Sequence, residues 1–94
     1  MPERRATVGS RVGLHARSAS VFVQAAGRQS VPVTIAKPDG DPVSAHSILS
    51  VLSLDVHHGD EVVLSAEGEG AEAALDDLAH LLEVDHDDPD AARG

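Results

Sequence analysis

His15 is the residue of this chain best placed to do chemistry, because it follows Gly13-Leu14 and stands directly ahead of a helical pattern. The apolar residues behind it recur at the spacing of one helix face: Ala19, Phe22, Val23 and Ala26. This pattern predicts a helix from about residue 16 to residue 26, ended by a left-handed glycine at Gly27. His15 is then expected at about the N-cap of that helix.

The chemistry that this position favours is the transient binding of a phosphoryl group. A helix N-terminus leaves N–H groups unpaired and attracts anions, and Arg17 adds a guanidinium group suited to phosphate. An unperturbed imidazole has a pKa near 6.5, so roughly three-quarters of it is neutral and nucleophilic at pH 7. Spacing alone leaves open that His15 only caps the helix and that Arg17 is a solvated charge.

The charge distribution separates the region around His15 from the rest of the chain. The net charge is −9, yet residues 1–28 hold five arginines against one glutamate, and residues 29–94 hold two basic against fifteen acidic residues. One interpretation is ordinary surface charge with an acidic tail. The other is that positive potential is kept near His15 for an anion.

Composition excludes several classes of function. With 94 residues the chain is expected to form one domain, and its only aromatic ring, Phe22, cannot provide the stacking platforms of nucleic-acid readers. There is no cysteine, and the histidines outside the site lack metal-ligand spacing, so neither a metal nor a cofactor is expected. The absence of a signal peptide or an apolar span predicts a cytoplasmic protein without membrane insertion.

The remaining elements predict a single α+β domain over residues 1–84. Strands are expected at 2–8, 31–36, 42–44 and 61–66, with helices at 48–54 and from residue 71. The order β-α-β-β-α-β-α suggests a four-stranded, mostly antiparallel sheet with three helices on one face. Residues 85–94 are predicted to be an acidic disordered tail.

The short helix at 48–54 has more apolar residues than one face of it can bury. Some of them should remain exposed, as at a docking surface. The predicted docking residues, with two from the first helix, are Ser20, Gln24, Ile48, Leu49 and Leu52. Ser47 is the predicted N-cap of this helix.

The stretch GLHARSASVFVQAA, followed by AHSILSVLSL and GDEVVLSAEGEGAEAALDDL, resembles the HPr family over about residues 3–83. These are the histidine-containing phosphocarriers of the phosphoenolpyruvate-dependent sugar phosphotransferase system. The resemblance implies an open-faced β-sandwich, a phosphorylated His15 and phosphate support from Arg17. It implies enzyme I as donor and enzyme II A domains as acceptors. Such a protein is a carrier rather than an independent enzyme, and we expect a monomer.

The resemblance also implies a regulatory serine, which falls on Ser47, with a serine kinase or phosphatase as a further partner. Two positions depart from the family pattern. Ser18 stands where the family usually has proline, which predicts a slightly less rigid site with its function retained. His46 stands where the family commonly has lysine, and its loss argues against recognition of Ser47 by a kinase.

The sequence is also compatible with three alternatives to a sugar-system carrier. One is a regulatory paralogue of the family that carries no sugar flux. Another is a carrier for a nitrogen-regulatory branch or for a dihydroxyacetone kinase. The last is a non-catalytic protein-interaction module.

Overall fold

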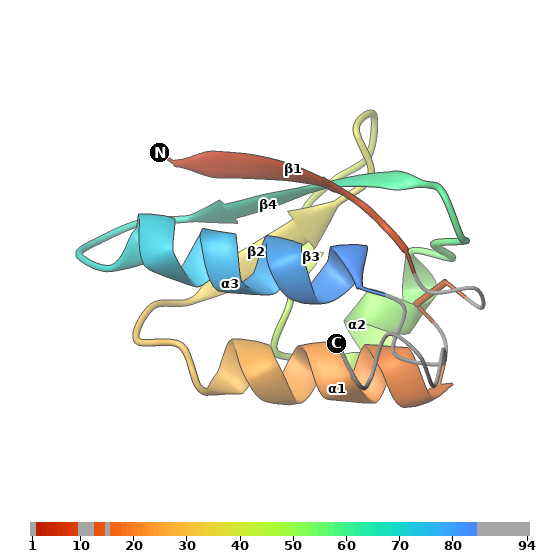
Figure 1. Cartoon of the computed structure of the whole chain (residues 1–94), viewed down its shortest axis with the longest axis horizontal. Coiled ribbons are helices and arrows are strands. Elements are labelled where there is room, and N and C mark those ends of the chain that lie inside the picture. The colour runs from red at the N-terminus through yellow and green to blue at the C-terminus, as the bar shows by residue number, and fades with distance from the viewer. Residues whose placement is uncertain (1, 10–12, 15, 85–94) are drawn as a thin grey trace.

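The computed structural model describes residues 2–9, 13–14 and 16–84. Its elements follow the predicted order: β1 (Glu3–Thr7), α1 (Ala16–Gly27), β2 (Val33–Ala36), β3 (Val43–Ser44), α2 (Ile48–Ser53), β4 (Glu61–Ala66) and α3 (Ala71–Glu83). Figure 1 shows the strands as one layer and the helices as a second layer beneath it. The α+β prediction is confirmed.

The sheet has the strand order β1-β4-β2-β3, and every neighbouring pair is antiparallel. The strand β4 lies inside the sheet, where Val62 is paired with Ala6 of β1 and Leu64 with Ile35 of β2. Alternation along β4 buries Val62 and Leu64 while leaving Glu61 exposed, as expected for a strand with one covered face. The predicted four-stranded open sheet is therefore confirmed.

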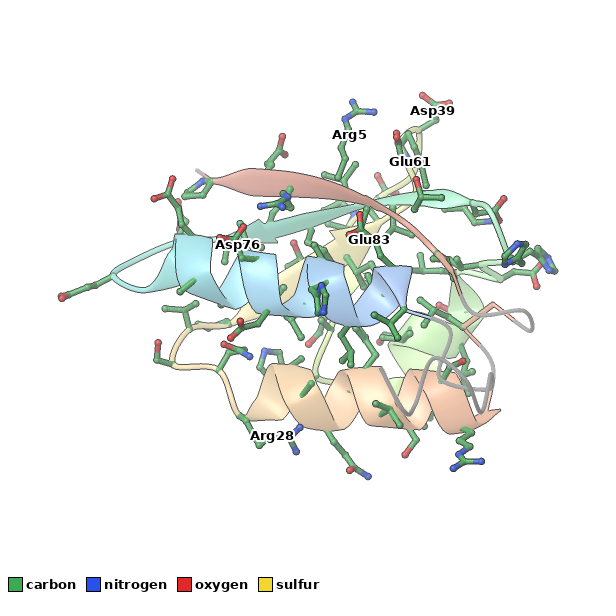
Figure 2. All side chains as sticks on the ribbon, in the orientation of Figure 1. Arg5, Arg28, Asp39, Glu61, Asp76 and Glu83 are labelled. Carbon is green, nitrogen blue, oxygen red and sulfur yellow. The ribbon has the colours of Figure 1, made fainter. Side chains whose placement is uncertain are left out.

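The other face of the sheet is open to water. Arg5 on β1 forms an ion pair with Glu61 on β4 at 2.7 Å, and both side chains are largely exposed. Figure 2 shows Arg5 and Asp39 on the side of the sheet away from the helices. The three helices thus all lie against the opposite face, as predicted.

The core is built from aliphatic side chains, with Phe22 of α1 as its only ring. The helix α3 contributes the broad apolar face that its pattern predicts, through Ala71, Ala74, Leu75, Leu78, Ala79 and Leu82. The small alanines let α3 lie close to β1 and β4, with which it is in contact. Glu72 stands in the first turn of α3, where a carboxylate complements the helix dipole.

Element boundaries differ from the predictions by one or two residues. The second strand begins at Val33 instead of residue 31, because Pro32 has no N–H to give to a ladder. The prediction of a left-handed Gly27 is wrong. This glycine belongs to α1 and has no positive φ; the helix closes instead through i→i−3 bonds from Arg28 and Gln29.

None of the described helices is long and apolar enough to cross a membrane. Within the described residues there is also no cluster of three or more His, Asp or Glu side chains that could hold a metal ion. The predicted tail, residues 85–94, lies outside the described residues.

Candidate functional site

The site is built around the start of α1, which begins at Ala16 as the sequence predicts. His15 itself lies outside the described residues. The backbone that leads to it is described at Gly13 and Leu14, and both residues are buried. The geometry of the site therefore rests on what holds these two residues and on what the first turns of α1 expose.

Two features of the backbone favour glycine at position 13. Its φ is +71°, a left-handed conformation that other residues adopt at a cost. A Cβ atom at this position would also lie 2.3 Å from the carbonyl oxygen of Val56 and 2.7 Å from the Cα atom of His57. The chain ahead of His15 thus passes directly against the backbone of residues 55–60.

The Gly13–Leu14 peptide is held by hydrogen bonds at both of its ends. The Leu14 N–H donates to the carbonyl of Val56 at 3.0 Å. On the other side, the hydroxyl of Ser18 donates to the carbonyl of Gly13 at 2.5 Å. Both groups belong to the same planar peptide unit, so its orientation is fixed between α1 and the turn at residues 55–60.

That turn is itself closed by several polar contacts. The His57 N–H donates to the carboxylate of Asp60 at 2.9 Å, and the imidazole of His57 lies 3.3 Å from the carboxylate of Asp55. Lys37 donates to the carbonyl of Asp55, a residue with a φ of +54°. Figure 1 shows this connection between α2 and β4 at the same end of the molecule as the start of α1. The turn therefore offers a defined surface against which Gly13 is held.

A second contact anchors the start of the segment that leads to the site. The Gly9 N–H donates to the carbonyl of Leu82 at 2.9 Å, near the end of α3. A Cβ atom on Gly9 would lie 2.1 Å from the carbonyl oxygen of Glu83. The segment from Gly9 to Gly13 is thus attached to the body of the protein at both of its described ends.

Arg17 is exposed in the first turn of α1, which contains no acidic residue. The structure shows which of the described N-terminal arginines lies near the site. Arg4 pairs with Asp76 of α3, Arg5 pairs with Glu61 of β4, and Arg28 lies at the far end of α1 (Figure 2). Of these four described arginines, Arg17 alone stands at the start of α1.

The short helix α2 has the mixed surface that its sequence predicts. Ser47 is its N-cap, and its hydroxyl accepts from the Ser50 N–H at 3.3 Å. Leu49 is 77% exposed and Ile48 38% exposed, whereas Val51 is fully buried and Leu52 half-buried. Two apolar side chains therefore face water on a helix that packs against α1.

The other two predicted docking residues lie on α1. Gln24 is exposed and donates to the hydroxyl of Ser20 at 3.4 Å, and Ser20 is half-buried. The two helices that carry all five predicted docking residues are in contact, with α2 beside the start of α1 (Figure 1). The docking role of these residues stays a prediction.

Val56 and the hydroxyl of Ser18 are the parts of the site that sequence reasoning missed. Val56 is an apolar residue inside a polar turn, which was the signal available in the sequence, and the structure shows it fully buried. The contact of Ser18 with Gly13 had no comparable signal, since serine in a first helical turn is ordinary.

The sequence is similar to known proteins over most of its length. A family model described as the PTS HPr component phosphorylation site matches residues 2–84. The phosphocarrier protein HPr of Streptomyces coelicolor is 58% identical over 82 residues, which cover 87% of this chain and 88% of that protein.

Solved structures share the overall fold of this chain. HPr from Bacillus anthracis superposes with a TM-score of 0.81 at 38% identity, over 86% of this chain and 95% of that one. A structure described as an HPr dimer from Thermoanaerobacter tengcongensis superposes with a TM-score of 0.67 at 41% identity, over 88% of this chain and 94% of that one.

Proposed function

Since the chain belongs to the HPr family of phosphocarrier proteins, we propose that His15 accepts a phosphoryl group from phospho-enzyme I and passes it to enzyme II A domains. The observation that carries this proposal is the family match across the phosphorylation site, combined with a histidine directly ahead of α1. No cofactor is required, because the histidine side chain is the carrier.

The chemistry proposed at His15 is nucleophilic attack by a neutral ring nitrogen on phosphorus. A nitrogen–phosphorus bond forms while the bond from phosphorus to the donor breaks. In the second transfer the acceptor attacks phosphorus, and the bond from phosphorus to the His15 nitrogen breaks. The start of α1 favours the added negative charge by about 0.3–1 kcal/mol at an exposed site. Arg17 adds a charge-assisted contact from the first turn. This support is modest, which suits a group that must be given away again.

Partners complete the transition state in this proposal. Phosphoryl transfer depends mainly on positioning and on neutralisation of charge, both of which a docked partner can supply. The exposed Ile48 and Leu49 offer an apolar contact beside the start of α1. We propose that enzyme I and enzyme II A domains bind this surface, together with Leu52, Ser20 and Gln24.

We further propose that the chain acts as a cytoplasmic monomer, with residues 1–84 as the carrier domain and residues 85–94 as an acidic tail. The monomer is the part of this proposal most open to test, because a related HPr has been described as a dimer. Sedimentation velocity at micromolar to millimolar concentrations would separate a monomer from a dimer.

Ser47 is a second proposed site, for regulation. Phosphorylation there would add about two negative charges beside Ile48 and Leu49 and would disfavour docking without rearranging the core. His46 in place of a lysine argues against the usual kinase recognition. Incubation with a serine kinase and ATP, with Ser47→Ala as the control, tests this proposal directly.

The main experiment is phosphorylation of the protein with phosphoenolpyruvate and a catalytic amount of enzyme I. We expect one acid-labile, base-stable phosphate per chain, absent in His15→Ala and retained in His80→Ala, a matched change at an exposed histidine on α3. No label under conditions that modify a control carrier would overturn the proposal. Label that enzyme II A domains fail to discharge would favour a regulatory paralogue or a carrier for another branch.

A further inference from the structure

Ser18 is a buried polar residue at the site for which phosphoryl transfer itself gives no role. It is 5% exposed and is the only buried polar or charged residue among the described parts of the chain. Its hydroxyl donates to the carbonyl of Gly13 at 2.5 Å. Phe22 and Leu82 are among the apolar side chains around it, so an unpaired hydroxyl would be costly here.

The accepting carbonyl has a special place in the chain. It belongs to the Gly13–Leu14 peptide, whose N–H donates to Val56 at 3.0 Å. His15 follows directly after Leu14. A rotation about ψ of Gly13 or φ of Leu14 that the other angle does not compensate would change the direction in which the chain enters His15.

Such a rotation is easy on the Gly13 side unless something opposes it. The rotation about ψ of Gly13 is the easier of the two, because glycine tolerates nearly all backbone conformations. Burial of the Leu14 side chain and the bond to Val56 hold one side of the unit. The Ser18 hydroxyl holds the other side, so a rotation of the unit breaks two hydrogen bonds, one to α1 and one to the turn at residues 55–60.

We propose that Ser18 is a positioning residue, whose hydroxyl fixes the Gly13–Leu14 peptide and thereby the placement of His15 for phosphoryl transfer. The proline that the family usually has at this position has no hydrogen-bond donor. A proline ring would restrict the backbone at position 18 itself, whereas the Ser18 hydroxyl restricts the Gly13–Leu14 peptide through a hydrogen bond. The catalytic part of this inference rests on the proposed function.

The test compares Ser18→Ala, which removes the hydroxyl, with Ser18→Thr, which keeps it. A void of about 10 Å³ beside Ser18 gives the threonine methyl group some space. Ser65→Ala is the matched control, because Ser65 lies on β4 and its hydroxyl contacts Glu3 at 3.4 Å, away from the site.

The first measurement is amide hydrogen exchange of Leu14 by NMR, with the amides of β4 in the same sample reporting global stability. In Ser18→Ala we expect Leu14 to exchange about two- to tenfold faster than the β4 amides account for, in keeping with loss of one hydrogen bond. Ser18→Thr should restore the wild-type rate, and Ser65→Ala should leave it unchanged. Equal Leu14 exchange in wild type and Ser18→Ala would show that the Ser18 hydroxyl does not fix the Gly13–Leu14 peptide.

The second measurement is the kinetics of phosphorylation by enzyme I. Ser18→Ala should lower kcat about two- to tenfold at unchanged KM, because the docking surface is intact, and Ser18→Thr should recover it. Faster exchange at Leu14 with an unchanged kcat would overturn the positioning role. If wild type itself is not labelled, the proposed function fails, and with it the role of Ser18 in phosphoryl transfer. The exchange result still decides whether the Ser18 hydroxyl fixes the Gly13–Leu14 peptide.

Discussion

At the residue scale, the site depends on one peptide unit that is held from two sides. Gly13 permits the backbone to pass against Val56, and the hydroxyl of Ser18 together with the Val56 carbonyl fixes the peptide that follows. Phosphate support is proposed for the exposed Arg17 of the first turn, whereas Gly13 and Ser18 are both buried. Their contribution is to the placement of the chain ahead of His15.

Gly13→Ala is expected to destabilise the protein by about 2–4 kcal/mol. About 1–2 kcal/mol comes from a left-handed residue with a Cβ atom, and the rest comes from a Cβ placed 2.3 Å from the Val56 carbonyl oxygen. Gly59→Ala is the matched control, because Gly59 has a φ of +86° and open space where a Cβ would be. Urea unfolding measures both, and equal losses would show that the close approach at Gly13 has no cost.

Arg17→Ala is expected to slow phosphorylation by enzyme I about tenfold, because a charge-assisted contact to the phosphoryl group is lost. The free energy of unfolding should stay within about 0.5 kcal/mol, since the side chain is exposed. Arg28→Ala removes an exposed arginine from the other end of the same helix and should leave the rate unchanged (Figure 2). Equal slowing in both variants would indicate a general charge effect instead of local support.

At the element scale, the junction between β3 and α2 is organised by two neighbouring side chains. Ser47 caps α2, and the Nε2 atom of His46 accepts from the Val33 N–H at 3.2 Å. That N–H belongs to the first residue of β2, so His46 joins the start of a strand to the start of a helix. The exposed apolar residues of α2 thus stand on a helix whose first turn is fixed.

Ser47→Ala is expected to destabilise the protein by about 1 kcal/mol, because the Ser50 N–H loses its cap. Ser47→Asp should retain most of the stability, since a carboxylate also caps and favours the helix dipole. Ser53→Ala, at the exposed end of α2, is the matched serine change and should cost less. Thermal or urea unfolding of the three variants is the measurement. A wild-type stability in Ser47→Ala would contradict the capping role.

The elements themselves were largely predictable, because apolar periodicity and turn residues mark each of them locally. The helix that follows His15, the N-cap at Ser47 and the exposed apolar residues of α2 all depend on local pattern and are confirmed. The contacts that hold the site were not predictable. Val56 meets Leu14 only because the sheet and α1 bring these distant segments together.

Both departures from the family pattern illustrate the same limit. By residue type alone, Ser18 predicts a slightly less rigid site, and His46 predicts the loss of a lysine. In the structure Ser18 donates to the Gly13 carbonyl and His46 accepts from the Val33 N–H. Proline has no side-chain donor and lysine no acceptor, so neither family residue could form these bonds. A comparison of residue types alone therefore counts what is lost and not what replaces it.

At the scale of the whole molecule, the arginines of β1 are paired with carboxylates away from the site, and Arg17 stands at the site. Arg4 and Arg5 of β1 are paired with carboxylates of α3 and β4, while Arg17 stands at the start of α1. The exposed Ile48 and Leu49 stand on α2, which packs beside α1 (Figure 1). A partner that docks on α2 therefore meets an apolar contact and a cation next to the chain segment that carries His15.

Leu49→Asp is expected to weaken the binding of both enzyme I and enzyme II A domains at least about tenfold, because docking would bury an unpaired carboxylate. The fold should be unaffected, since the Leu49 side chain is 77% exposed. Ala73→Asp is the matched control, as it adds the same charge to an exposed apolar position on α3. The KM for enzyme I and the calorimetric Kd for an enzyme II A domain measure the effect. Since the proposed function has one surface serve donor and acceptor in turn, loss of only one of the two affinities would contradict a shared docking face.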